Sequence, residues 1–100
     1  MIVRSLSDVI AFSPEQASKM TVAEGDHCRV TVWCLEPGQE IRPHVHAGDH
    51  VWVVQQGAGW FLSQGQEHRV SPGVIVFAPA GEVHGMRAEG QLVFTSVTAG

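Results

Sequence analysis

Three histidines occupy seven consecutive positions in the segment HVHAGDH, at His44, His46 and His50. Imidazole is a common transition-metal ligand, because its neutral ring offers a nitrogen lone pair. One interpretation is a metal site that these three side chains share. The alternative is three polar side chains on a solvated loop, which a histidine cluster alone does not exclude. The backbone elements that carry the histidines decide between the two.

The backbone around this cluster cannot be a helix if the rings are to meet. A helix places His46 and His50 on one face but directs His44 elsewhere. The proline before the cluster and the glycine within it also oppose a helix. On a strand, His44 and His46 point to the same face, but a straight strand would carry His50 about 20 Å away. The rings therefore meet only if the chain reverses, and residues 47–49 form a suitable turn.

The rest of the chain supplies the strands that such a site needs. Runs rich in β-branched and aromatic residues alternate with turn segments such as GAG, SPG and PAG. We expect strands at 28–35, 50–55, 59–63, 67–70, 74–78 and 91–97. Short strands at this spacing predict an all-β sandwich or barrel. Residues 13–20 alone look helical, with Ser13 as the N-cap and Pro14 at the first helical position.

Composition limits the possible roles. The chain has 100 residues, of which 44% are hydrophobic and 16% charged, which predicts one packed domain. Its net charge is −4 and its six basic residues are scattered, so we expect no nucleic-acid partner. No segment approaches the about 20 apolar residues of a membrane span. Cys28 and Cys34 are expected to be reduced thiols in a cytoplasmic protein.

A fourth histidine, His84, follows a predicted strand and the turn PAG. The histidines and glycines then form two spaced patterns. Gly38, five residues, HVH, three residues, His50, six residues and Gly57 resemble the first motif of the cupin superfamily. Gly73, five residues, PAG, two residues and His84 resemble the second. Two motifs at matching spacing identify the chain as similar to small single-domain cupins.

The resemblance implies a fold and an assembly. The fold would be an all-β, antiparallel cupin barrel of the jelly-roll or double-stranded β-helix type, formed by residues 28–100. Residues 1–27 would be an N-terminal segment that contacts a partner in a homodimer. The low charge content agrees with apolar surface buried against a second subunit.

The resemblance also implies a ligand set. His44, His46, His50 and His84 would bind one divalent transition metal, which could be Mn, Fe, Zn, Ni or Cu. His50 stands where most cupins have a glutamate, and Ala88 stands where the second motif has an asparagine. Four neutral ligands leave the full charge of the ion uncompensated, which makes it a stronger Lewis acid.

The substrate pocket is expected above the metal. Strand parity turns Trp52 and Val54 inward with His50, and similar cupins direct the face of Phe94 and Ser96 toward the metal. The pocket would then be mostly apolar. This favours a metal-dependent enzyme with oxidative, dioxygenase-like chemistry on a small organic substrate, although no catalytic residue is assigned.

Other functions stay open at this point. One is a non-catalytic cupin that binds a metal or small ligand, and another is a sugar-acid isomerase. Asp49 and Glu82 are the only carboxylates beside the motifs that could act as a general base. His27 and His68 match neither motif and are expected on the surface.

Overall fold

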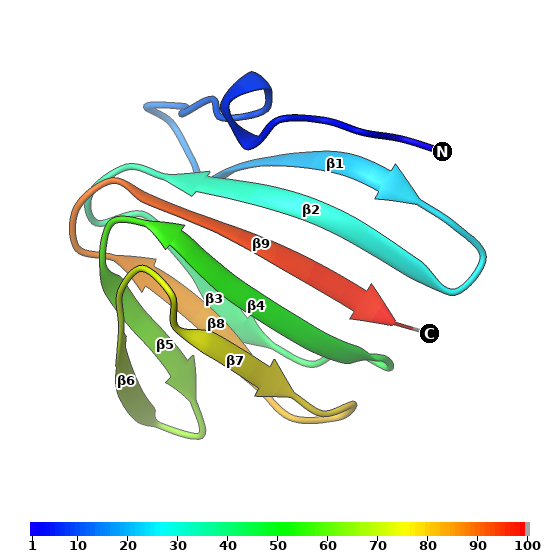
Figure 1. Cartoon of the computed structure of the whole chain (residues 1–100). Coiled ribbons are helices and arrows are strands. Elements are labelled where there is room, and N and C mark those ends of the chain that lie inside the picture. The colour runs from blue at the N-terminus through cyan, green and yellow to red at the C-terminus, as the bar shows by residue number, and fades with distance from the viewer. Residues whose placement is uncertain (100) are drawn as a thin grey trace.

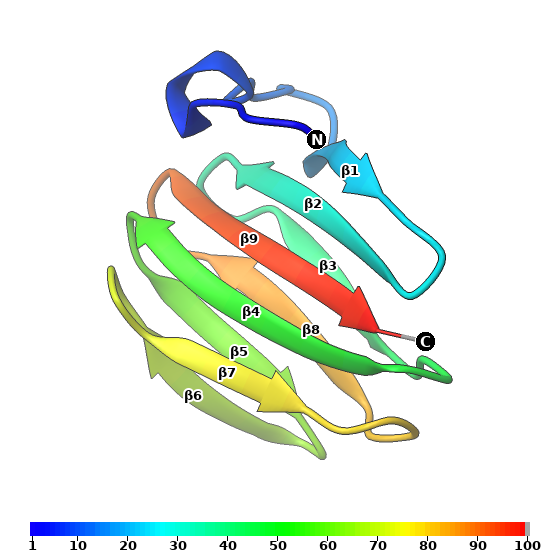
Figure 2. The same cartoon turned by 45° about the vertical axis from the view of Figure 1, so that its right-hand side comes forward.

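The computed structural model describes residues 1–99 as nine strands and one short 3-10 helix. The elements are η1 (Leu6–Asp8), β1 (Ser18–Glu24), β2 (Cys28–Leu35), β3 (Glu40–His44), β4 (Asp49–Gln56), β5 (Gly59–Ser63), β6 (Gln66–Val70), β7 (Ile75–Ala78), β8 (His84–Ala88) and β9 (Leu92–Ala99). One sheet has the order β1-β2-β9-β4-β7 and the other β3-β8-β5-β6, with all paired neighbours antiparallel. The two sheets face each other as a sandwich (Figures 1 and 2). The predicted all-β architecture of antiparallel strands is confirmed.

Alternating side chains let β4 bury one face against the main core. In β4, His50, Trp52 and Val54 are buried and the residues between them are more exposed, as expected for period-two alternation. Buried apolar side chains from both sheets make the main core, with Leu35, Trp52, Phe61, Met86 and Phe94 among them. The aromatic and β-branched runs therefore became strands because each could bury one face.

The expected helix at residues 13–20 is wrong. Residues 18–24 form β1, which pairs antiparallel with β2, with Ser18 opposite Cys34. The Ser13 hydroxyl accepts a hydrogen bond from the Glu15 backbone N–H at 3.3 Å, which closes a local turn. Pairing with an available strand edge outweighs a weak helical preference. This strand lies within the N-terminal segment expected at residues 1–27.

The residues before β1 pack on the side of the larger sheet that faces away from the main core (Figure 1). Val9 is buried there against a second hydrophobic cluster that includes Val32, Cys34 and Val93. Both cysteines are free thiols. Within residues 1–99, no helix has the length and apolar character needed to cross a membrane.

Candidate metal centre

The site forms where the two sheets and two loops meet. His44 ends β3 and pairs directly with His84, which begins β8. His46 lies on the β3–β4 loop and His50 lies in β4, on the opposite sheet. Gly85 allows β8 to approach β3 closely, because a Cβ there would lie 2.5 Å from a backbone oxygen of β3. The chain therefore reverses between His46 and His50, as the sequence predicted.

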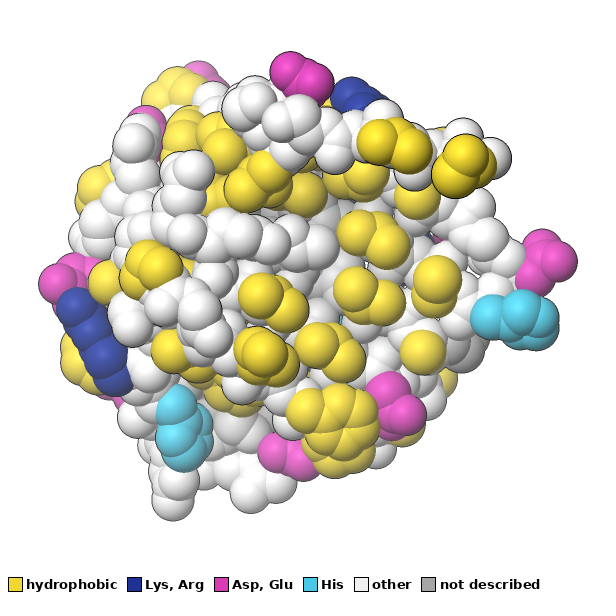
Figure 3. Space-filling model, in the orientation of Figure 1, with side chains coloured by type: hydrophobic (Ala, Val, Ile, Leu, Met, Phe, Trp, Pro, Cys, Tyr) yellow, Lys and Arg dark blue, Asp and Glu magenta, His cyan; other side chains and the backbone are white. Residues whose placement is uncertain are grey.

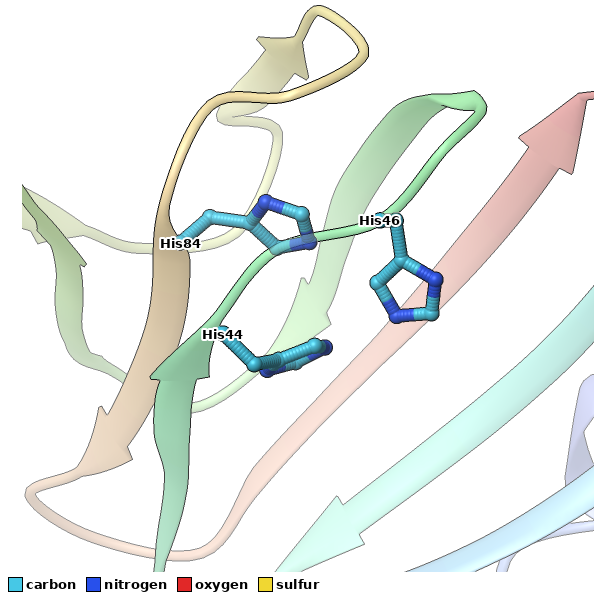
Figure 4. A group of neighbouring side chains, drawn as sticks. All are labelled: His44, His46 and His84. Atoms are coloured by element: carbon cyan, nitrogen blue, oxygen red, sulfur yellow. The ribbon is translucent and has the colours of Figure 1, made fainter.

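Three histidine side chains converge on one point. The possible ligand atoms of His44, His46 and His84 all lie within 4.8 Å of one another, and their rings turn toward a common space (Figure 4). The ring of His50 is adjacent, with centroids 4.1 Å from His46 and 4.7 Å from His84, but His50 is not part of the group of three. The cluster can therefore supply three imidazole nitrogens to a metal, with a fourth ring beside them.

Hydrogen bonds orient two of these rings as metal ligands. Nδ1 of His44 donates to the Arg42 carbonyl at 2.8 Å, and Nδ1 of His84 donates to the Glu82 carbonyl at 2.9 Å. Because a carbonyl can only accept, the proton lies on Nδ1 and Nε2 keeps its lone pair. Nε2 of His84 is buried without a hydrogen-bond partner, which is costly unless a ligand satisfies it. The residues therefore fit a transition metal.

His50 has a different hydrogen-bond environment. Its Nδ1 lies 3.3 Å from Nε1 of Trp52, and an indole N–H can only donate, so Nδ1 accepts. The neutral ring then carries its proton on Nε2, which is buried without a partner. Binding a metal through Nε2 requires the proton on Nδ1 instead. The Thr98 hydroxyl, 3.5 Å from the same Nδ1, is the acceptor that this second tautomer needs.

Burial favours the neutral form of His46, His50 and His84 in the absence of an ion. Burial first, and then the charges of the neighbouring histidines, lower the pKa of His50 to about 4. Burial likewise lowers the pKa of His46 and of His84 below the ordinary value. A neutral imidazole is the form that binds a metal, so these rings are ready to act as ligands at neutral pH.

Two hydrogen bonds tie the loops that carry the ligands. The Gly81 N–H donates to the His46 carbonyl, and the Ala80 N–H donates to Oδ1 of Asp49, both at 2.9 Å. Gly81 has φ +84°, a conformation that side chains disfavour, so a glycine suits the turn before His84. Asp49 therefore fixes the relative position of the two motifs.

A cavity of about 150 Å³ opens beside the histidines. Of the predicted pocket residues, Trp52 and Ser96 line it, whereas Val54 and Phe94 lie in the main core and are 1% and 0% exposed. Phe94 stacks on Trp52 with ring centroids 5.1 Å apart, so it supports the pocket from behind. The other lining residues are Lys19, Thr21, Arg29, Thr31, Trp33, His44, His46, His50 and Thr98.

The expectation of a mostly apolar pocket is wrong, because most of these lining side chains are polar or charged. The polar residues missing from the sequence analysis come from β1 and β2. Alternation along the predicted strand 28–35 already placed Arg29, Thr31 and Trp33 on one face. Lys19 could not be placed, because the sequence predicts a helix where its strand begins. His27 and His68 are exposed, as expected.

Comparison with known proteins agrees with this architecture. The chain resembles the crystal structure of TT1209 from Thermus thermophilus, with 30% identity, a TM-score of 0.92 and coverage of 99% of this chain and 97% of that one. A conserved protein with a double-stranded β-helix domain from Klebsiella pneumoniae shows 32% identity, a TM-score of 0.91 and coverage of 97% and 88%. The polyketide cyclase RemF from Streptomyces resistomycificus shows 26% identity, a TM-score of 0.80 and coverage of 99% and 80%.

A search of curated proteins found no match. The model of the cupin domain family matches residues 31–98, which include both histidine motifs, all of β3 to β8 and most of β2 and β9. The chain therefore belongs to the cupin family.

Proposed function

We propose that this cupin is a metal-dependent enzyme that acts on a small organic substrate. His44, His46 and His84 would hold the ion, and His50 would be the fourth ligand. The observation that carries the proposal is the convergence of three imidazole nitrogens within 4.8 Å. The buried, unpartnered Nε2 atoms of His84 and His50 support it, because a metal bond would satisfy both.

The ligand set limits the kind of metal. Imidazole suits Zn, Cu, Fe and Ni. We propose one of these ions or Mn, which the cupin resemblance adds to the set. When bound, such an ion supplies Lewis-acid or redox chemistry to a substrate oxygen in the pocket. The chain's own contribution is to orient the rings of His44 and His84 through the carbonyls of Arg42 and Glu82, while burial lowers the pKa of His84 and favours its neutral form.

The carboxylates near the site are engaged elsewhere. Asp49 accepts from the backbone of Ala80, and Oε1 of Glu82 lies 3.4 Å from the Ser63 hydroxyl. Neither of them lines the cavity. This favours a reaction centred on the metal, such as oxidative, dioxygenase-like chemistry, over one that needs a carboxylate base. The similarity to RemF, a polyketide cyclase, supports an enzymatic role for a cupin of this architecture.

Two alternatives each have an observation in their favour. Sugar-acid isomerisation needs polar groups around the substrate, and the hydroxyls of Thr31, Ser96 and Thr98 line the cavity. A non-catalytic role in binding a metal or small ligand is favoured by the lack of a carboxylate among the described lining residues. Oxygen-dependent turnover of a substrate would distinguish the proposed enzyme from both alternatives.

We also propose a homodimer that involves residues 1–27 and the face of the larger sheet that points away from the core. Hydrophobic side chains are spread over this side of the molecule (Figure 3). Ile75 and Phe77, on the edge strand β7, are 68% and 60% exposed, and Met1 and Ile2 are also exposed. Burial of these side chains against a second copy would remove apolar surface from water.

The test begins with the metal content of the purified protein, measured by plasma mass spectrometry. We expect about one ion per chain, lost in His84→Ala and retained in the matched surface variant His68→Ala. Oxygen consumption is then followed with diketones, phenols and thiols. A metal-free protein under all loading conditions contradicts the proposal, and a loaded protein that turns over no substrate of any class favours the binding role.

A further inference from the structure

We propose that the cavity beside the histidines binds a small organic acid, whose carboxylate is recognised by Lys19 and Arg29. This inference rests on the proposed function, because it names the substrate class of the same site. The observation that carries it is that two cations, three histidines and several hydroxyls line one cavity. The cavity includes no carboxylate among its described lining residues.

The register of the larger sheet places these groups in rows across the inner face. In the first row, Arg29 on β2 is opposite Thr98 on β9, and Thr98 is opposite His50 on β4. In the next row, Thr31 is opposite Ser96. Arg29 therefore shares a row with a cluster histidine, with one hydroxyl-bearing residue between them. An anion beside the cluster would lie within the field of this guanidinium.

Lys19 reaches the same cavity from β1, the edge strand. It lies opposite Trp33 in the β1–β2 pair, and its ammonium is 5.5 Å from the centre of the Trp33 ring. This cation–π contact holds the ammonium over an aromatic side chain that also lines the cavity. The indole N–H of Trp33 in turn donates to the Ser96 hydroxyl at 3.2 Å. Lys19 is exposed, and this contact with Trp33 keeps its ammonium at the edge of the cavity.

Neither cation at the cavity forms an ion pair in the described part of the chain, although Glu24 lies opposite Arg29 in the β1–β2 pair. Among residues 1–99, the ion pairs join Arg69 with Glu89 and Arg87 with Glu67, and neither Lys19 nor Arg29 has an acidic partner. This matters in a chain of net charge −4, where acidic residues outnumber basic ones. Two unpaired cations at one small cavity therefore indicate an anionic ligand.

The lining favours a carboxylate on a small apolar body over inorganic phosphate. Phosphate sites in proteins commonly use backbone N–H groups at helix N-termini or glycine-rich loops, whereas this cavity is lined by side chains from strands. The rings of Trp33 and Trp52 offer apolar surface for the rest of the molecule. With about 150 Å³, the cavity is smaller than typical pockets for drug-sized ligands, so the acid must be small.

The test uses lactate as the probe and lactamide as its neutral counterpart. Both of them, and inorganic phosphate, are titrated into the Zn²⁺-loaded and the metal-free protein. Binding is followed by NMR at the indole N–H signals of Trp33 and Trp52. Zinc content is measured on the same samples. The double variant Lys19→Gln/Arg29→Gln is compared with Arg4→Gln, which removes one positive charge outside the cavity.

We expect lactate to bind the wild type and Arg4→Gln with similar Kd values. The Kd should rise about threefold for each cavity substitution and about tenfold in the double variant, as expected for exposed charge pairs. Added salt should weaken binding to the wild type more than to the double variant. Lactamide should not distinguish the two proteins.

Equal lactate affinity in the wild type and the double variant overturns the inference, as does tighter binding of phosphate than of lactate. The inference is also overturned if lactate binds neither the Zn²⁺-loaded nor the metal-free wild-type protein. A protein that takes up no zinc contradicts the metal proposal alone, because the titration of the metal-free protein still decides whether Lys19 and Arg29 bind the carboxylate.

Discussion

Replacing His50 should change how the stability of the metal-free protein depends on pH. Burial holds the folded-state pKa of this imidazole at about 4, below its ordinary 6.5. Below pH 6.5 the imidazole is protonated in the unfolded chain but stays neutral in the folded protein. The contribution of His50 to the unfolding free energy is therefore fully present above pH 6.5 and declines as pH falls toward 4. From pH 6.5 to 5.0 the decline is 1.5 pH units, or about 2 kcal/mol at about 1.36 kcal/mol per unit.

The suitable variant is His50→Gln, because the glutamine oxygen can still accept from the Trp52 indole. Urea unfolding is followed by tryptophan fluorescence at pH 7.5 and 5.0, with a chelator present. Between these pH values we expect the wild type to lose about 2 kcal/mol more unfolding free energy than His50→Gln. The exposed His68→Gln variant should behave as the wild type does. If His50→Gln shows the same pH dependence as the wild type, His50 does not titrate as a buried neutral group.

Three further predictions concern the metal, the loops and the assembly. Trp52→Phe removes the donor that holds Nδ1 of His50 as an acceptor, so metal affinity should rise by up to about fivefold, while Thr98→Val should lower it. Competition with a chromophoric chelator measures both, and unchanged affinities would remove His50 from the ligand set. Asp49→Ala should cost about 1 kcal/mol of unfolding free energy in urea and weaken metal binding, because the loops lose a hydrogen bond. An effect on neither would show that Asp49 does not fix the motifs. Light scattering at micromolar concentration should report about twice the 10.8 kDa of one chain, and a mass equal to one chain would contradict the dimer.

The sequence pattern predicted the strands that bury one face in the core. It did not predict the strands that form only because they pair with a neighbouring strand. The runs in β2, β4, β5, β7 and β9 are rich in β-branched and aromatic residues, so their periodicity is visible. In contrast, β3 contains Pro43 and β8 begins with the pair His84-Gly85. Neither reads as a strand in isolation, because pairing of each with the other determines its conformation.

The residues of the site also fall into those that local sequence patterns predicted and those that depend on strand pairing. The placement of His44 beside His46 and the return of the chain that brings His50 next to His46 followed from parity and a turn, which are local properties of the chain. The position of His84 followed only from a family resemblance, because its approach depends on pairing across a sheet. Lys19 was missed for the same reason, since its place in the cavity depends on the pairing of β1 with β2.

The distribution of the histidines between the two sheets has a mechanical consequence. His44 and His84 belong to the smaller sheet, whereas His50 belongs to the larger one. An ion bound by all of them would act as a cross-link that clamps one end of the sandwich and closes a long stretch of chain into a ring. The opposite end has no such clamp, so hydrogen exchange would slow at the histidine end on loading while the far turns stay nearly as they were.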